Sequence, residues 1–141
     1  VIGKFLCCCA IGLFTTWVSN VAIAKCLRIT SEDDLVTIEG RLSLQVFPGR
    51  PNYENVAEGD EPEPTWIVTL DKKICIDDGG EFTDPNVMFD TVHVYTGHKD
   101  MEIELRSMNG KLVRVTGRGF GAHTGHHHAP LVEEVESIQA Q

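Results

Sequence analysis

The stretch that decides the fold is Val36-Thr37-Ile38-Glu39-Gly40-Arg41-Leu42-Ser43-Leu44-Gln45-Val46. Apolar and polar residues alternate along it, which is the period of a β-strand with one buried face. Five apolar residues share the face expected to point inward: Val36, Ile38, Leu42, Leu44 and Val46. Gly40 falls on this same face, where a missing side chain lets a long strand coil sharply. The stretch therefore predicts a long first strand shared by both halves of a small β-barrel.

The rest of the chain supplies the other elements of such a barrel. A second strand is expected over 66–76, with a bulge or tight turn at 71–73, and a third over 91–95, with Val92 and Val94 inward and His93 outward as a surface residue. Helical spacing of Met101, Leu105 and Met108, stopped by Asn109-Gly110, predicts a helix over 100–109. Further strands are expected over 111–118 and 131–138. This order predicts a mainly β fold, namely a five-stranded OB-like Greek-key barrel with one helix between strands three and four. A five-stranded roll of another connectivity is the alternative.

The amino end has the features of a secretory signal peptide. Lys4 supplies a positive charge, residues 5–18 are almost wholly apolar, and Val21-Ala22-Ile23-Ala24 offers a small-x-small cleavage pattern. The apolar run is short for a membrane span, so a retained anchor is less favoured. We expect cleavage after Ala24, which leaves residues 25–141 as a single OB-like domain. The expected location is periplasmic or secreted, with no stable membrane anchor.

Two of the five cysteines lie outside the expected signal peptide. Cys7, Cys8 and Cys9 would leave with it, and in an exported chain Cys26 and Cys75 most simply form one disulfide. Lipidation of Cys26 is the alternative. Lys25 disfavours it, because a small residue is expected directly before a lipidated cysteine.

The charge of the chain disfavours one class of partner. The net charge is −9 at pH 7, and it becomes −10 when Lys4 is removed with the signal peptide. An acidic surface repels phosphate backbones, and no row of stacking aromatics is evident on the strands. We therefore expect no nucleic acid partner.

Two loops are candidates for a binding face, because the connections after strands one and four frame the usual ligand face of an OB-fold. The first, over 48–65, contains an acidic run at 54–64, which we interpret as an exposed solvated loop; a cation-binding patch is its functional alternative. The second, over 119–130, carries four histidines. Phe120, Glu61 and Glu63 are the candidate ligand-contacting residues of these loops. The turn at 77–81 lacks the ligand spacing of an EF-hand, and turn chemistry alone explains its Asp and Gly residues.

The histidine run suggests a transition-metal site. Imidazole is the commonest protein ligand for such metals and is mostly neutral at pH 7. His123, His126, His127 and His128 are the candidate ligands, and three nitrogens with an open or carboxylate-filled fourth position suit zinc, copper or nickel. The alternative is structural: the rings pack against the barrel rim or hydrogen-bond the glycine-rich backbone.

Three segments resemble an uncharacterised domain family of exported bacterial proteins. They are Gly110-Lys111-Leu112-Val113-Arg114-Val115-Thr116-Gly117, the His-Thr-Gly-His-His-His-Ala-Pro-Leu run at 123–131, and Glu58-Gly59-Asp60-Glu61-Pro62-Glu63-Pro64. The resemblance implies an exported domain with an OB-like fold, but no established activity.

Taken together, the residues favour a binding module whose unknown small ligand or protein partner contacts loops 48–65 and 119–130, with a transition metal as one possible ligand. A protein-interaction or inhibitory module with purely structural histidines is the alternative. A small hydrolase is less favoured: His123 or His126 would act as base, oriented by Glu133 or Glu134. No activated Ser or Cys nucleophile is identifiable.

Overall fold

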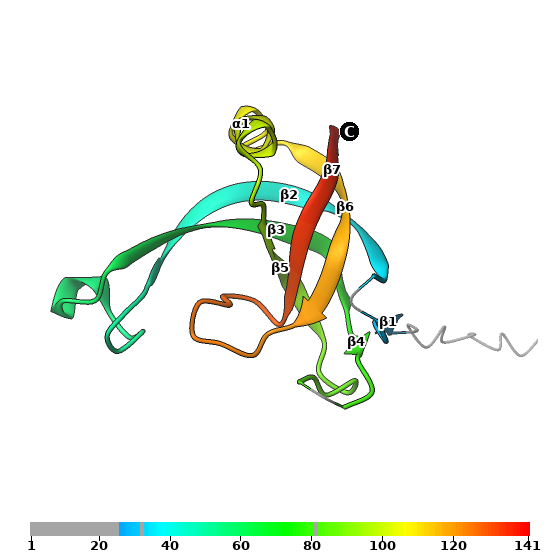
Figure 1. The fold of residues 1–141 in the computed structure, drawn as a ribbon, viewed down its shortest axis with the longest axis horizontal. Helices are drawn as coiled ribbons and strands as arrows, with labels where there is room; N and C mark the ends of the chain where they lie inside the picture. The colour runs from blue at the N-terminus through cyan, green and yellow to red at the C-terminus, as the bar shows by residue number, and fades with distance from the viewer. Residues whose placement is uncertain (1–25, 32, 81) are drawn as a thin grey trace, which may run out of the picture.

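The computed structural model describes residues 26–31, 33–80 and 82–141. Its elements are arranged around one sheet (Figure 1), which has five strands. The expected signal peptide and Cys7, Cys8 and Cys9 lie outside these residues. None of the helices in the described part of the chain has the length and apolarity needed to cross a membrane.

Five long strands pair with one another in a closed cycle, in which the last strand pairs with the first. These strands are β2 (Leu35–Pro48), β3 (Pro62–Ile74), β5 (Phe89–Tyr95), β6 (Leu112–Gly121) and β7 (Leu131–Ala140). They pair in the order β2-β3-β5-β7-β6, and β6 pairs in turn with β2. The β5–β7 pairing is parallel and the other four are antiparallel. The predicted mainly β fold with one helix between the third and fourth long strands is confirmed.

Strand β2 serves both sides of the sheet, as its sequence pattern predicts. Gly40 is paired with Leu70 of β3 and with Val113 of β6, so it lies where β2 changes from one partner to the other. A Cβ atom at this position would clash with the backbone carbonyl of Thr69. Glycine is therefore required here by the close approach of the neighbouring strand.

The alternation of β2 overstates how far the core extends. Val36, Ile38 and Leu42 are buried as predicted, but Leu44 and Val46 are 39% and 61% exposed. The β2–β6 pairing ends at Arg41, whereas the β2–β3 pairing continues to Pro48. Beyond Leu42 the two strands thus form an arm that projects from the sheet (Figure 1), and the prediction that Leu44 and Val46 are inward is wrong.

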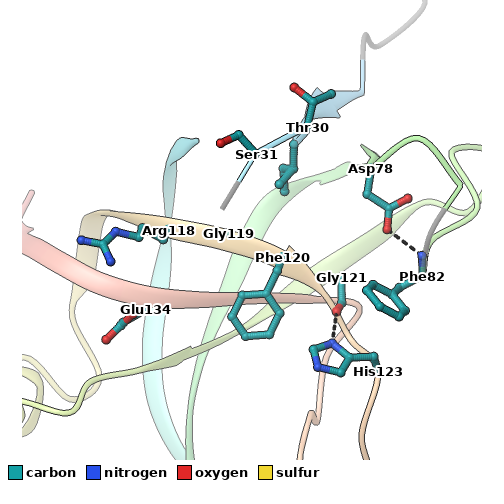
Figure 2. A pocket seen from close by; sticks show the side chains of 11 residues that line it. Thr30, Ser31, Asp78, Phe82, Arg118, Gly119, Phe120, Gly121, His123 and Glu134 are labelled. Atoms are coloured by element: carbon teal, nitrogen blue, oxygen red, sulfur yellow. Dashed lines mark hydrogen bonds between the residues drawn. The ribbon is translucent and has the colours of Figure 1, made fainter. Parts of the chain in front are cut away.

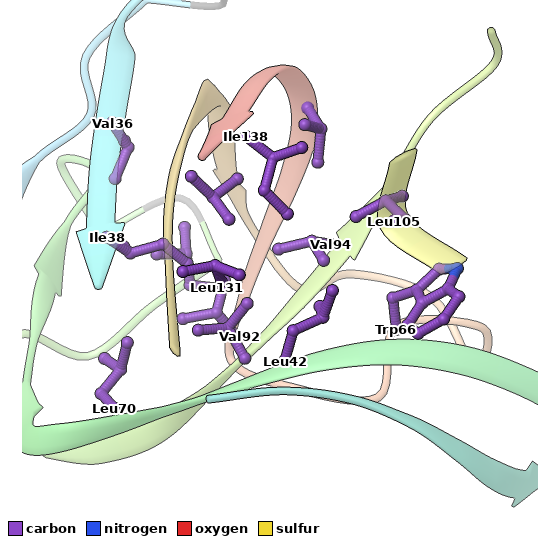
Figure 3. Close-up of a cluster of buried hydrophobic side chains, with 14 of the residues drawn as sticks. Val36, Ile38, Leu42, Trp66, Leu70, Val92, Val94, Leu105, Leu131 and Ile138 are labelled. Atoms are coloured by element: carbon purple, nitrogen blue, oxygen red, sulfur yellow. The ribbon is translucent and has the colours of Figure 1, made fainter. Parts of the chain in front are cut away.

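The core lies in the space that the five curved strands enclose, and the helix α1 (Lys99–Ser107) lies at one end of this core (Figures 1 and 3). Leu105 is completely buried, and Met101 and Met108 pack against the core cluster, as their helical spacing predicts. The chain leaves the helix through Gly110, whose φ of 81° favours glycine. The indole Nε1 of Trp66 donates to the Glu102 carboxylate at 3.3 Å, which ties the helix to β3.

A disulfide fastens the amino-terminal segment to the sheet. The predicted Cys26–Cys75 bond is present, with the two Cα atoms 4.5 Å apart. Directly after Cys26 the short strand β1 (Leu27–Arg28) pairs in parallel with β4 (Ile76–Asp77). The interruption predicted at 71–73 takes the form of a register shift between Thr69 and Ile74, while β3 itself continues through it.

One residue of the acidic loop is not solvated. The loop between β2 and β3 contains the short 3-10 helix η1 (Val56–Glu58), and Asp60 is only 5% exposed. Its carboxylate accepts backbone N–H groups of Glu54 at 2.7 Å, Asn55 at 2.9 Å and Asn52 at 2.9 Å. These hydrogen bonds hold the pKa of Asp60 below its usual value. Asp60 organises the loop from inside, which corrects the interpretation of 54–64 as uniformly solvated.

Candidate functional site

The histidine loop joins β6 to β7 and is shorter than predicted. Strand β6 continues to Gly121, so Phe120 lies on a strand and the loop covers residues 122–130. Backbone hydrogen bonds from Ala122 N to Pro130 O at 3.0 Å and from His127 N to Thr124 O at 3.1 Å close it. The loop is therefore internally bonded rather than simply extended.

Glu63 connects this loop to β3, because the strand begins at Pro62 and the loop predicted over 48–65 covers only residues 49–61. Its two carboxylate oxygens bond His126 Nδ1 at 2.6 Å and His128 Nε2 at 2.9 Å, and the hydroxyl of Tyr53 lies 3.0 Å from His126 Nε2. Burial acts to raise the pKa of Glu63, but the hydrogen bonds from His128 and His126 leave that pKa below its usual value. The histidine loop is thus joined to the start of β3 through Glu63 and to the loop before β3 through Tyr53.

His93 is a member of this cluster that the sequence did not indicate. It projects from β5 on the outer face, as predicted, but the histidine loop covers it. The ring of His128 lies between Phe47, at 4.4 Å and 5° between planes, and His93, at 5.9 Å and 24°. Burial, then the neighbouring His128 and His127, lowers the pKa of His93 to about 4. The interpretation of His93 as an ordinary surface residue is wrong.

His123 does not contact Glu63 as His126 and His128 do, and its ring lies instead beside Phe82 and Phe120. Its Nδ1 lies 3.0 Å from the carbonyl oxygen of Gly121, and its ring centroid lies 4.8 Å from Phe82 and 5.6 Å from Phe120. The backbone N–H of His123 donates to His127 Nδ1 at 3.0 Å. Because it accepts this hydrogen bond, His127 Nδ1 carries no proton. Burial and the neighbouring histidines lower the pKa of His127, in keeping with a neutral ring.

A cavity of about 460 Å³ opens beside His123 (Figure 2). It lies between the end of β6, the segment after β1 and the turn after β4. Phe82, Phe120 and His123 gather at one end, and Arg118 and Glu134 lie at the other (Figure 2). The lining residues are Ile29, Thr30, Ser31, Asp78, Phe82, Arg118, Gly119, Phe120, Gly121, His123 and Glu134. Its volume is within the range of small-molecule sites, roughly 300–1,000 Å³.

The structure separates the predicted site residues into two groups. His126 and His128 converge on Glu63, whereas His123 and Phe120 line the cavity. His127 packs edge-on to Phe120, and Glu61 is exposed. Within residues 26–31, 33–80 and 82–141 no three His, Cys, Asp or Glu side chains are grouped so that they could hold a metal ion. The metal site stays a prediction from sequence.

Glu133 cannot orient a histidine, which corrects one part of the hydrolase hypothesis. It lies on the interior face of β7 with no exposed surface, paired in register with Val94 and Gly119. Neither carboxylate oxygen has a hydrogen-bond partner among the described residues. Burial raises its pKa to about 8.

The fold and site define a mainly β domain with a preformed cavity beside a fastened histidine loop. Residues 91–139, from β5 through β7, match a family described as Domain of unknown function (DUF4431). This match confirms the resemblance to an uncharacterised domain family, and it includes the whole histidine loop. No curated protein matches the chain.

The hydrogen bonds of Glu63 to His126 and His128 should stabilise the fold. Replacing Glu63 with Ala is expected to lower the free energy of unfolding by roughly 2 kcal/mol, because two hydrogen bonds to a carboxylate are lost. Urea unfolding near neutral pH measures this loss. Glu61→Ala, two residues away and exposed, is the matched control and should change stability by less than about 0.5 kcal/mol. Equal effects of the two substitutions would show that the His–Glu63 contacts do not stabilise the fold.

Proposed function

We propose that this domain is an exported OB-like binding module that takes a small ligand in the cavity beside His123. The cyclic strand order, the parallel β5–β7 pair and the helix between β5 and β6 support an OB-like Greek-key barrel. The disulfide is compatible with an oxidising compartment, which supports export.

The observation that carries the proposal is an exposed aromatic side chain directed at a preformed cavity. Phe82 is 51% exposed, and its ring lies against His123 on the cavity wall. Leaving the exposed half of such a ring in water forgoes burial worth about 1 kcal/mol, which a ligand that covers it recovers. A preformed cavity with aromatic walls and a few polar groups is the usual form of a small-molecule site.

The histidine loop contributes in two ways on this proposal. His126 and His128, bonded to Glu63, hold the loop in place, so that the wall formed by His123 does not need to be ordered by the ligand. A wall that is already ordered lowers the entropic cost of binding. The structural alternative for the histidines thus accounts for one part of the run, and ligand binding for another.

A protein-interaction role is the second candidate. Leu44 and Val46 lie on one face of the projecting β2–β3 arm and are exposed. Exposed apolar residues that recur on one strand face are a common feature of interaction sites.

Fragment binding followed by ¹⁵N–¹H correlation spectra tests the ligand site. We expect planar, partly apolar fragments to shift the amide signals of Phe82, Phe120 and His123, and Phe82→Ala to weaken binding about fivefold or more. Val46→Ala, on the arm, removes an exposed apolar side chain far from the cavity and should leave fragment affinity unchanged. A fragment set that shifts no amide signal around the cavity would overturn the ligand-binding proposal.

A further inference from the structure

The geometry points to an organic cation as the ligand of this cavity: an amine or quaternary ammonium group attached to an apolar or aromatic body. This inference rests on the proposed ligand-binding function and names the chemical class that the cavity walls select. It follows from the charges at one end of the cavity and the rings at the other.

The first observation is an excess of carboxylates around a single guanidinium. Arg118 is paired across the β6–β7 register with Glu134, and its Nε lies 3.0 Å from the carboxylate of Glu136. Asp78 is on the cavity wall as well, where its carboxylate accepts the backbone N–H of Phe82 at 2.8 Å. Two carboxylates therefore lie beside this guanidinium, and Asp78 adds a third on the cavity wall beside Phe82, so the charge around the cavity is negative.

The charge of Glu134 affects the pKa of Tyr95, although Arg118 is nearby. Tyr95 is the register partner of Glu134 on β5. Burial raises the pKa of Tyr95, and the Glu134 carboxylate raises it further by more than Arg118 lowers it. The carboxylate of Glu134, which lines the cavity, is the group there that can act as counter-ion to a ligand cation.

The second observation is the arrangement of the rings. Phe82 and His123 are tilted by 30° at 4.8 Å, and Phe120 and His123 by 51° at 5.6 Å. Rings inclined to one another in this way form walls rather than a closed stack, and all three line the cavity (Figure 2). Faces of aromatic rings attract cations, and recognition of ammonium groups by aromatic walls is a well-established use of this interaction.

The third observation is that the charges of the chain disfavour an anionic ligand of similar size to the proposed cation. The chain carries a net charge of −9, which attracts cations to its surface and repels anions. The guanidinium of Arg118, the cation that could receive a ligand carboxylate, is already engaged by Glu136. An aromatic acid therefore finds rings to stack on but an unfavourable charge environment.

Three probes with one ring in common test the inference: benzyltrimethylammonium, phenylacetate and benzyl alcohol, each titrated into the ¹⁵N-labelled chain. We expect the ammonium probe to bind the most tightly of the three and to shift the signals of Phe82, Phe120 and His123 in a saturable manner. Glu134→Gln is expected to weaken its binding about fivefold, and added salt to weaken it further. Glu104→Gln, which removes an equal charge from the exposed face of α1, is the matched control and should leave the affinity unchanged.

The outcomes separate this inference from the function on which it rests. Equal binding of phenylacetate or benzyl alcohol at the same amides would overturn the cation class and leave the ligand site standing. Binding of the ammonium probe that is insensitive to both Glu134→Gln and salt would overturn the role of the carboxylates. The absence of shifts with all three probes, combined with a fragment set that also fails, would overturn the ligand site itself.

Discussion

Replacing Cys26 with Ser is expected to lower the free energy of unfolding by about 4 kcal/mol under oxidising conditions. The Cys26–Cys75 bond closes a loop with a sequence separation of 49, and its loss lets the unfolded chain explore conformations that the bond forbids. Cys26 is the better position to change, because it is partly exposed whereas Cys75 is only 3% exposed. A serine hydroxyl at Cys75 would add a burial cost of its own.

The same bond should hold one wall of the cavity in place. Ile29, Thr30 and Ser31 follow Cys26 closely and line the cavity, and the β1–β4 pairing that positions them has only two residues in each strand. We therefore expect Cys26→Ser to weaken fragment binding as well as to lower stability.

Reduction supplies the control for the cysteine substitution. Urea unfolding of the original chain with and without dithiothreitol should show the same loss as the substitution, and Cys26→Ser itself should be insensitive to reductant. If reduction leaves the unfolding midpoint of the original chain unchanged, the bond does not contribute in the way proposed.

Sequence reasoning succeeded where a feature depends on neighbours along the chain. Alternation over 36–42, the helical spacing of Met101, Leu105 and Met108, and the glycines at 40 and 110 each reflect local geometry, and the structure has each in its predicted place. The cysteine pair was predictable for a different reason, because two cysteines outside the expected signal peptide allow a single pairing.

The contacts of the candidate site could not be predicted in this way. Glu63 lies 63 residues from His126 and 65 from His128, and no local pattern records that the histidine loop turns toward β3. His93 follows the predicted strand alternation, yet its burial depends on a loop that folds down over the outer face. The alternation of β2 failed at Leu44 and Val46 for the same reason, since the sequence does not tell where the pairing of β2 with β6 ends.

The burial of Glu133 on strand β7 could not be predicted from the sequence. Leu131, Val132 and Glu133 are all buried, because both faces of the strand are covered at this point, so the period of two gives no register. Gly117 on β6 leaves room for the Glu133 side chain, whose Cγ lies 3.1 Å from where a Cβ of residue 117 would be. The interior therefore accommodates the carboxyl group sterically while giving it no hydrogen-bond partner among the described residues.

Glu133→Gln is expected to stabilise the domain at pH 7 by about 3 kcal/mol and to have almost no effect at pH 4.5. Burial raises the pKa of Glu133 to about 8 in the folded chain, from an ordinary value of 4.5. Below pH 4.5 the carboxyl is protonated in the folded and unfolded states alike, so it contributes no pH dependence. Between pH 4.5 and 8 the unfolded state releases a proton that the folded state retains, and stability falls by about 1.4 kcal/mol per pH unit. Glutamine has the same shape and cannot ionise, so it removes this loss.

Urea unfolding at several pH values from 4.5 to 8 measures the effect as a difference that grows with pH. Glu136→Gln is the matched control on the same strand: its side chain is 41% exposed and paired with Arg118, so its substitution should shift stability by less than about 1 kcal/mol and without this dependence on pH. A difference between Glu133→Gln and the original chain that is constant across the range would mean that the carboxyl ionises in the folded state as it does in water. That result would require a water path or a cationic partner to reach Glu133, and its position in the core would have to be revised.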